Sequence, residues 1–143
     1  MPWPGTHRVG RALSVPAVLR VSVGGGNPNV SDKSPTVRGL SLRLKNDADA
    51  YDLLMISEPV LFAATSASFV AFPQARVADP ETGKPDPENI KAYEARFPDG
   101  KLQPQLLASH PAPASYGTTA YFSTHAFHFV DSNGEGVWGR LIM

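Results

Sequence analysis

Two polar side chains stand inside an otherwise apolar segment near the start of the chain. Arg20 and Ser22 alternate with Leu19, Val21 and Val23. Successive side chains of a strand point to opposite faces, so the two polar residues share one face. That face is either open to solvent, which is the ordinary situation, or turned into a polar pocket. In a pocket, the planar and permanently charged guanidinium of Arg20 would suit a carboxylate.

The histidines do not form a metal site by their spacing. His7, His110 and His128 are each typical of a surface histidine or a satisfied core histidine. No two histidines have the i, i+4 spacing of a helical metal site, and no carboxylate is placed as an obvious third ligand. We therefore expect no metal ion held directly by histidines.

Composition indicates one globular domain over residues 1–143 and excludes several functions. The chain is 42% hydrophobic and 18% charged, and its 13 basic residues equal its 13 acidic residues. This balance does not support binding to nucleic acid or to an anionic membrane. The absence of cysteine excludes disulfides and thiolate chemistry. The apolar runs are too short to span a bilayer, the first residues do not resemble a secretion signal, and the compartment, cytoplasm or periplasm, is left open.

Alternating apolar and polar residues predict strands over residues 17–23, 38–44 and 50–56. Glycine, asparagine and proline between the first two strands predict a long loop over residues 24–35. An Asn-Asp-Ala-Asp run at residues 46–49 predicts the turn of a hairpin. Such strands suit a curved antiparallel sheet or barrel with two chemically different faces.

Helices are expected after these strands, and then strands again. The first helix is predicted from Thr65 or Ser66 to about residue 77, bent or split by Pro73. A second is predicted over residues 87–97 and a third over residues 102–110, interrupted by Pro104. The last elements are listed in chain order: a strand over 119–130, a turn with an Asn-Gly pair over 131–134, and a returning strand over 135–142.

Three of these segments, in this order, resemble the core of the haem catalases and the shorter catalase-related peroxidases. They are PAVLRVSVGG at residues 16–25, RGLSLRL at 38–44 and DLLMISEPVLFAA at 52–64. A fourth, STHAF at residues 123–127, resembles the family's G-S-H-T-F strand. The resemblance implies an α+β fold: a partial antiparallel β-barrel of the catalase type with appended helices, which binds haem b and acts on hydrogen peroxide.

The resemblance also implies roles for individual residues. Arg20 and His125 match positions beside the haem propionates, and Ser22 matches a serine that hydrogen-bonds the catalytic histidine. Gly39 matches a glycine that lets the sheet approach the porphyrin closely. Three apolar residues match the packing against the porphyrin: Leu54, Leu61 and Phe69.

One departure selects a branch of the family. Ile56 stands where catalases proper carry an asparagine beside the peroxide site. An asparagine amide can steer peroxide by hydrogen bonding, and isoleucine cannot. The form D-L-V-M-I-S-x-P, which DLLMISEP at residues 52–59 resembles, occurs in the catalase-related peroxidases. Ile56 therefore favours peroxide reduction with an external electron donor over disproportionation.

Two residues of the family's iron site are expected outside this chain. The catalytic histidine precedes the first strand by several tens of residues, whereas His7 precedes Arg20 by thirteen and would be that base only if the intervening segment were deleted. The haem-ligating tyrosine belongs to an R-x-x-x-Y pattern, which none of the four tyrosines here has. The sheet is also expected to be incomplete at Met143, which favours self-association through an open edge.

Two other interpretations remain beside the peroxidase. One is a catalytically inert haem-binding fragment that keeps the propionate side of the pocket. The other is a lipocalin-like carrier of a different apolar ligand, which explains the alternating strands but not the ordered motifs. A histidine-bearing segment and an R-x-x-x-Y helix encoded in the flanking DNA would favour the enzyme.

Overall fold

The computed structural model describes residues 14–25, 28–47, 49–131 and 133–143. The chain forms two compact units. The first unit joins the residues up to Pro59 with Pro113–Met143, and the second unit is Val60–Ala112. Among the described residues, no helix is long and apolar enough to cross a membrane.

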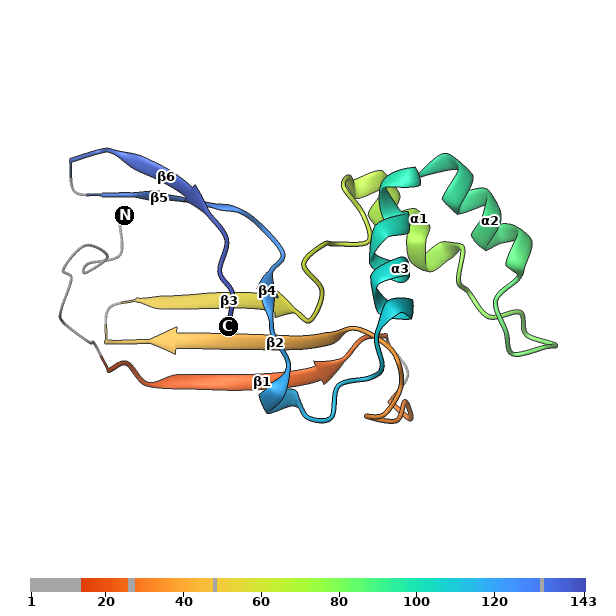
Figure 1. The fold of residues 1–143 in the computed structure, drawn as a ribbon, viewed down its shortest axis with the longest axis horizontal. Helices are drawn as coiled ribbons and strands as arrows, with labels where there is room; N and C mark the ends of the chain where they lie inside the picture. Colours follow the sequence, from red (N-terminus) through yellow and green to blue (C-terminus); the bar gives the residue numbers. More distant parts are fainter. Residues whose placement is uncertain (1–13, 26–27, 48, 132) are drawn as a thin grey trace. The chain divides into compact units, whose positions relative to one another are not determined.

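An antiparallel sheet forms the first unit. Its strands follow the order β1-β2-β3-β4, and Figure 1 shows β1, β2 and β3 running side by side. Their bounds are β1 at Ala17–Val23, β2 at Arg38–Lys45, β3 at Ala50–Ile56 and β4 at Phe122–Ser123. The three strands predicted from alternation are therefore confirmed. So is the antiparallel sheet, although the described strands do not close into a barrel.

The apolar face of this sheet holds the core of the first unit. Leu40 of β2 pairs with Met55 of β3, and both are buried together with Tyr121. The predicted turn at residues 46–49 joins these strands, with the Asn46 amide donating to the Asp49 carbonyl oxygen. The short turn sets the register, so the alternating leucines of β2 all point to the core side.

The predicted strand over residues 119–130 is wrong in its continuity. Residues 124 and 125 form a bend that separates β4 from β5, Phe127–Val130. The bend is stabilised by the Ser123 hydroxyl, which donates to the His125 carbonyl oxygen at 2.8 Å. Such a local side-chain bond offers the backbone an alternative to the ladder.

A separate hairpin pairs β5 with β6, Gly136–Gly139. The predicted turn between them is confirmed: Asp131 Oδ1 accepts the amides of Asn133 and Glu135, and Gly134 has a φ of 86°. The returning strand is shorter than the predicted 135–142. Beyond it the chain turns back to β4, where the Ser123 amide donates to the Leu141 carbonyl oxygen.

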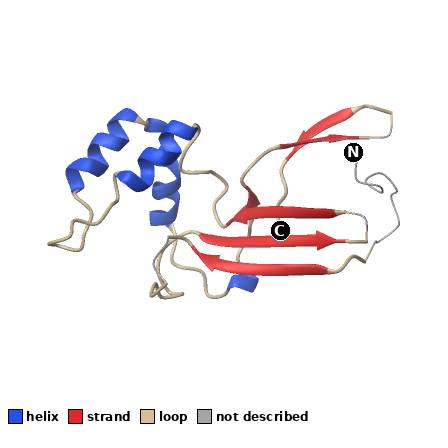
Figure 2. Ribbon diagram, turned by 180° about the vertical axis from the view of Figure 1, so that it is seen from behind, coloured by secondary structure: helices blue, strands red, loops and turns tan. Residues whose placement is uncertain are grey.

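Helices make up the second unit, drawn in blue in Figure 2. Thr65 caps the first helix reciprocally with Ser68, because its hydroxyl accepts the Ser68 amide and the Ser68 hydroxyl accepts the Thr65 amide. Asp86 caps the second by accepting the Glu88 amide. The bounds are α1 at Ser66–Gln74, α2 at Pro87–Arg96, a 3₁₀ turn η1 at Pro98–Lys101 and α3 at Leu102–Ser109.

Two prolines act differently from the prediction. Pro73 neither bends nor splits α1 but is its penultimate residue, so the helix ends at residue 74 rather than 77. The Phe72 carbonyl left at this end accepts a hydrogen bond from the Arg76 guanidinium at 3.2 Å. Pro104 does not interrupt α3, because as the third helical residue it lies in the first turn, where the amide has no intrahelical acceptor.

Aromatic rings pack the core of the second unit. Tyr93 of α2 meets Phe72 of α1 edge to face, with ring centroids 5.6 Å apart. The Tyr93 hydroxyl donates to the Phe62 carbonyl oxygen, and the Arg76 guanidinium carbon lies 3.7 Å from the centroid of the Phe72 ring. Apolar and cation–π contacts thus fix the helices to the segment that follows β3.

Candidate functional site

Strand register gathers four of the predicted site residues on one face of the sheet. Arg20 pairs with Ser41, which pairs with Leu54 on the next strand. Two residues further along, Ser22 pairs with Gly39. Directly paired residues point to the same side of a sheet. We call the face that carries Arg20, Ser22, Gly39 and Leu54 the site face.

The site face is open, whereas the opposite face is packed at β2 and β3. The Leu54 side chain is 61% exposed, and Arg20, across Ser41 on the other side of β2, is also exposed. On the opposite face, the next residue of β3, Met55, is 3% exposed. A sheet face that exposes a leucine on one strand and an arginine two strands away is suited to a ligand with an apolar body and an acidic edge.

Gly39 makes room for the Ser22 side chain. A Cβ at position 39 would lie 2.5 Å from the Ser22 Oγ, far inside van der Waals contact. The absence of a side chain on β2 therefore lets the serine hydroxyl lie over the sheet. It also leaves the site face flat at this point, as close approach by a planar ligand requires.

Two predicted wall residues, Leu61 and Phe69, belong to the second unit. Phe69 lies on α1 and is 50% exposed, with its ring centroid 5.1 Å from that of Phe62. Leu61 is half-buried in the segment that precedes α1. Both are apolar residues with accessible surface, and their role against a porphyrin stays a prediction.

The fifth predicted site residue of the first unit, His125, lies in the bend between β4 and β5 rather than in a strand. Its side chain is exposed, and Nδ1 lies 2.8 Å from the Thr124 Oγ1. That contact orients the ring and occupies one nitrogen, so Nε2 is the nitrogen directed to other partners. His7, weighed above as a catalytic base, lies outside the described residues.

The buried tyrosines have the properties of structural phenols. The Tyr121 hydroxyl donates to the Tyr116 carbonyl oxygen, and burial raises the pKa of Tyr121. Burial, with the charge of Asp99, also raises the pKa of Tyr93. Raised pKa values keep these hydroxyls protonated, which is opposite to what an iron-ligating tyrosinate needs. Among the described residues, no group of three metal-ligating side chains is placed to hold a metal ion.

Arg38 organises the loop beside β1, which the sequence did not reveal. Its side chain is 1% exposed, although it belongs to a strand that begins at the protein surface. The guanidinium donates to three backbone carbonyls of the loop, those of Asp32, Ser34 and Thr36, at 2.5–2.7 Å. The only sequence signal was the position of an arginine directly after a long polar loop whose carbonyls lack strand partners.

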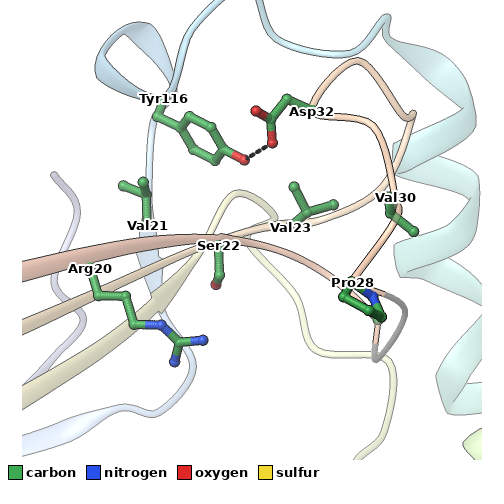
Figure 3. Close-up of a pocket in the computed structure, with 9 residues that line it drawn as sticks. Arg20, Val21, Ser22, Val23, Pro28, Val30, Asp32 and Tyr116 are labelled. Atoms are coloured by element: carbon green, nitrogen blue, oxygen red, sulfur yellow. Dashed lines mark hydrogen bonds between the residues drawn. The ribbon is translucent and has the colours of Figure 1, made fainter.

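A pocket of about 380 Å³ lies between β1 and this loop. Figure 3 shows Tyr116 and Asp32 on one side of it, joined by a hydrogen bond from the phenol to Asp32 Oδ1 of 2.8 Å. Val21 and Val23 point toward that pair, while Arg20 points to the other side of β1. The remaining lining residues are Ser22, Gly25, Pro28 and Val30. Asp32 and Tyr116 were not predicted as site residues, because their approach joins segments 84 residues apart.

Comparison with known proteins finds matches over most of the chain. The family model described as Catalase matches residues 9–143. A protein named catalase-related peroxidase from Synechococcus elongatus is 37% identical over 123 residues, which are 85% of this chain and 36% of that protein. A second of that name, from Mycolicibacterium paratuberculosis, is 31% identical over 89% of this chain and 40% of its own length. Catalase-A of Dictyostelium discoideum is 26% identical over 94% of this chain and 27% of its own length.

Solved structures share the fold. The structure of a bacterial catalase has a TM-score of 0.77 and 22% identity over 88% of this chain and 25% of its own. A fungal catalase crystal structure has the same TM-score, at 21% identity and 26% of its length. The chain thus spans well under half the length of the relatives it matches. The Catalase family model matches nearly all residues of this chain, which therefore belongs to the catalase family.

Proposed function

We propose that this chain forms part of the haem pocket of a catalase-related peroxidase, which reduces hydrogen peroxide with electrons from an external donor. In this proposal residues 1–143 are one incomplete domain of the enzyme, built from both units. The observation that carries it is the shared site face of Arg20, Ser22, Gly39 and Leu54. The family match and the 37% identity to a catalase-related peroxidase support it.

The site face fits haem b by its chemistry. A porphyrin needs a flat apolar surface beside a cation, and the exposed Leu54, the bare Gly39 and the exposed Arg20 provide these on adjacent strands. Haem, when bound, supplies the iron chemistry that breaks the peroxide O–O bond. The guanidinium of Arg20 would hold a propionate through paired hydrogen bonds.

Ser22 and His125 are positioning residues in this proposal. The Ser22 hydroxyl, which lies over Gly39, would hydrogen-bond the family's catalytic histidine and orient its ring. His125 would carry its proton on Nε2, with Nδ1 accepting from Thr124, and would donate to a propionate. For Leu61 and Phe69, which belong to the second unit, contact with the porphyrin is what the family resemblance implies.

Ile56 favours peroxidase chemistry over peroxide disproportionation. It pairs with Gly39 and therefore belongs to the site face, where catalases proper carry an amide. A hydrocarbon side chain cannot polarise a second peroxide molecule, so an external reductant would return the enzyme to its resting state. This is why the proposal includes an electron donor.

Titration of the chain with hemin tests the proposal. We expect weak binding in the Soret band and little peroxide turnover by the chain as it stands, because the family's catalytic histidine and iron-ligating tyrosine are not expected among these residues. Arg20→Gln should weaken the binding roughly tenfold, the effect of one charged hydrogen-bond pair. Arg96→Gln is the matched control, since Arg96 is also an exposed arginine but belongs to α2 rather than to the sheet.

The outcomes separate the interpretations. Equal hemin affinity in the two variants would remove Arg20 from the pocket and contradict the proposal. Hemin binding that depends on Arg20, without peroxide turnover, would support the proposal that the chain forms part of a haem pocket. It would also be consistent with the alternative of an inert haem-binding module. A tyrosinate-type ferric spectrum with peroxide turnover would overturn the expectation of low activity.

A further inference from the structure

We propose that the pocket between β1 and the loop held by Arg38 binds the reductant of the reaction, a small neutral phenol. This inference rests on the proposed function for its role, but the binding itself does not require haem. The pocket's volume of about 380 Å³ lies within the range of small-molecule sites. A cavity of about 150 Å³ already accepts a benzene ring, so one substituted ring fits here.

The pocket wall is built rather than incidental. Arg38, buried at 1% exposure, donates its guanidinium hydrogen bonds to the carbonyls of Asp32, Ser34 and Thr36. Holding a buried cation against these three carbonyls fixes residues 32–36 of the loop in one conformation. A wall fixed before binding spares the ligand the entropic cost of ordering it.

The lining selects the chemical class of the ligand. Val21, Val23, Pro28 and Val30 supply apolar surface for a ring. Asp32 supplies a hydrogen-bond acceptor at one end, and it already accepts a phenolic hydroxyl there, that of Tyr116, at 2.8 Å on Oδ1. A carboxylate has two oxygens and about four lone-pair sites, so a second phenol can donate to Oδ2. A phenolate has no O–H to donate, so the neutral phenol is the form that this acceptor would bind.

The position relative to the site face suits electron donation. Arg20 and Ser22 line this pocket and also belong to the site face, so the pocket and the site face adjoin each other along β1. In the balanced reaction, two phenols reduce one hydrogen peroxide to two waters. Each phenol O–H bond breaks, its proton passes to the Asp32 carboxylate and on to the water product, and its electron passes to the oxidised enzyme, leaving two phenoxyl radicals.

Binding of 4-fluorophenol to the chain, followed by ¹⁹F NMR together with amide shifts, tests the site without haem or peroxide. We expect saturable shifts at Val21 and Val23. Asp32→Asn should weaken the binding about tenfold, as for one hydrogen bond to a charged group. Asp52→Asn, an exposed carboxylate of the same sheet outside the pocket, should leave it unchanged. The methyl ether 4-fluoroanisole, which cannot donate, should bind about tenfold more weakly than the phenol.

Equal binding of phenol and ether, or equal binding by Asp32→Asn and Asp52→Asn, would overturn the proposal. The proposal would also be overturned if the amide shifts of Val21 and Val23 changed with protein concentration and not with phenol concentration. Such a dependence would mean that β1 pairs with another chain instead of binding phenol. Phenol binding that depends on Asp32 supports the pocket even where hemin binding fails, in which case only the proposed function falls. Arg20-dependent hemin binding without phenol binding would overturn the pocket alone.

Discussion

The Oγ of Ser22 lies 2.5 Å from the position that a Cβ on Gly39 would occupy, across the β1–β2 ladder. The two residues therefore depend on each other: the hydroxyl is placed where it is because β2 has no side chain opposite it. In the proposed pocket this contact orients Ser22 and keeps the site face flat.

Gly39→Ala should lower the free energy of unfolding by about 1 kcal/mol, because the methyl group displaces the Ser22 hydroxyl from its rotamer. In a Ser22→Ala background the same change should stabilise by about 0.5 kcal/mol. There the Ser22 Cβ, 3.9 Å away, is the nearest side-chain atom, and the chain loses less entropy than with glycine. Urea denaturation of the four proteins of this cycle measures the sign change. The same sign in both backgrounds would contradict the contact.

Arg38→Met should destabilise the first unit by about 2–4 kcal/mol, because it leaves three loop carbonyls without their charged donor. Arg20→Met is the control on the neighbouring strand. Since Arg20 is exposed, its loss should change stability by less than about 0.5 kcal/mol. Chemical denaturation compares the two, and equal effects would mean that Arg38 does not organise the loop.

The sequence predicts those parts of the site face whose strand register is determined by a short local turn. Alternation placed Arg20 and Ser22 on one side of β1, and the short turn at residues 46–49 fixed the pairing of β2 with β3. Once that register exists, Leu54 must share a face with Ser41. The pairing of β1 with β2 was not predicted, because the long loop between them does not determine register.

Other features could not be read from the chain because tertiary contacts decide them. The burial of Arg38 depends on hydrogen bonds to loop carbonyls. Every residue has a backbone carbonyl, so the sequence does not indicate which ones an arginine will contact. The break of the predicted last strand depends on one side-chain bond, from Ser123 to His125. The Tyr116–Asp32 hydrogen bond joins distant segments, which periodicity does not detect. Pro104 was misjudged because its effect depends on where α3 begins.

Tyr93 should make the stability of the second unit fall at alkaline pH. Burial, then Asp99, raises its pKa above the ordinary value of 10.0, so the folded state holds the phenolic proton more tightly than the unfolded state. This contribution is complete below pH 10 and is lost as pH rises through the folded-state pKa. Urea midpoints between pH 8 and about pH 12 should decline, alongside a late rise of tyrosinate absorbance.

Tyr93→Phe separates this effect from the alkaline response of the other tyrosines. Below pH 10 the variant should be less stable by about 1 kcal/mol, because it loses the hydrogen bond to the Phe62 carbonyl oxygen. Its alkaline decline should be shallower than that of the parent chain. An unchanged slope would assign the decline to other groups.

Self-association through β1 is the last expected outcome. β1 lies at one end of the described sheet, and three of its apolar side chains are exposed: Val18 at 71%, Leu19 at 54% and Val21 at 39%. An edge strand with this much apolar surface pairs readily with another chain. Size-exclusion chromatography should show a species that grows with concentration, and Leu19→Lys should reduce it, whereas Val70→Lys on α1, where Val70 is 54% exposed, should not. A monomer at all concentrations would contradict the prediction, and equal effects of the two lysines would move the contact away from β1.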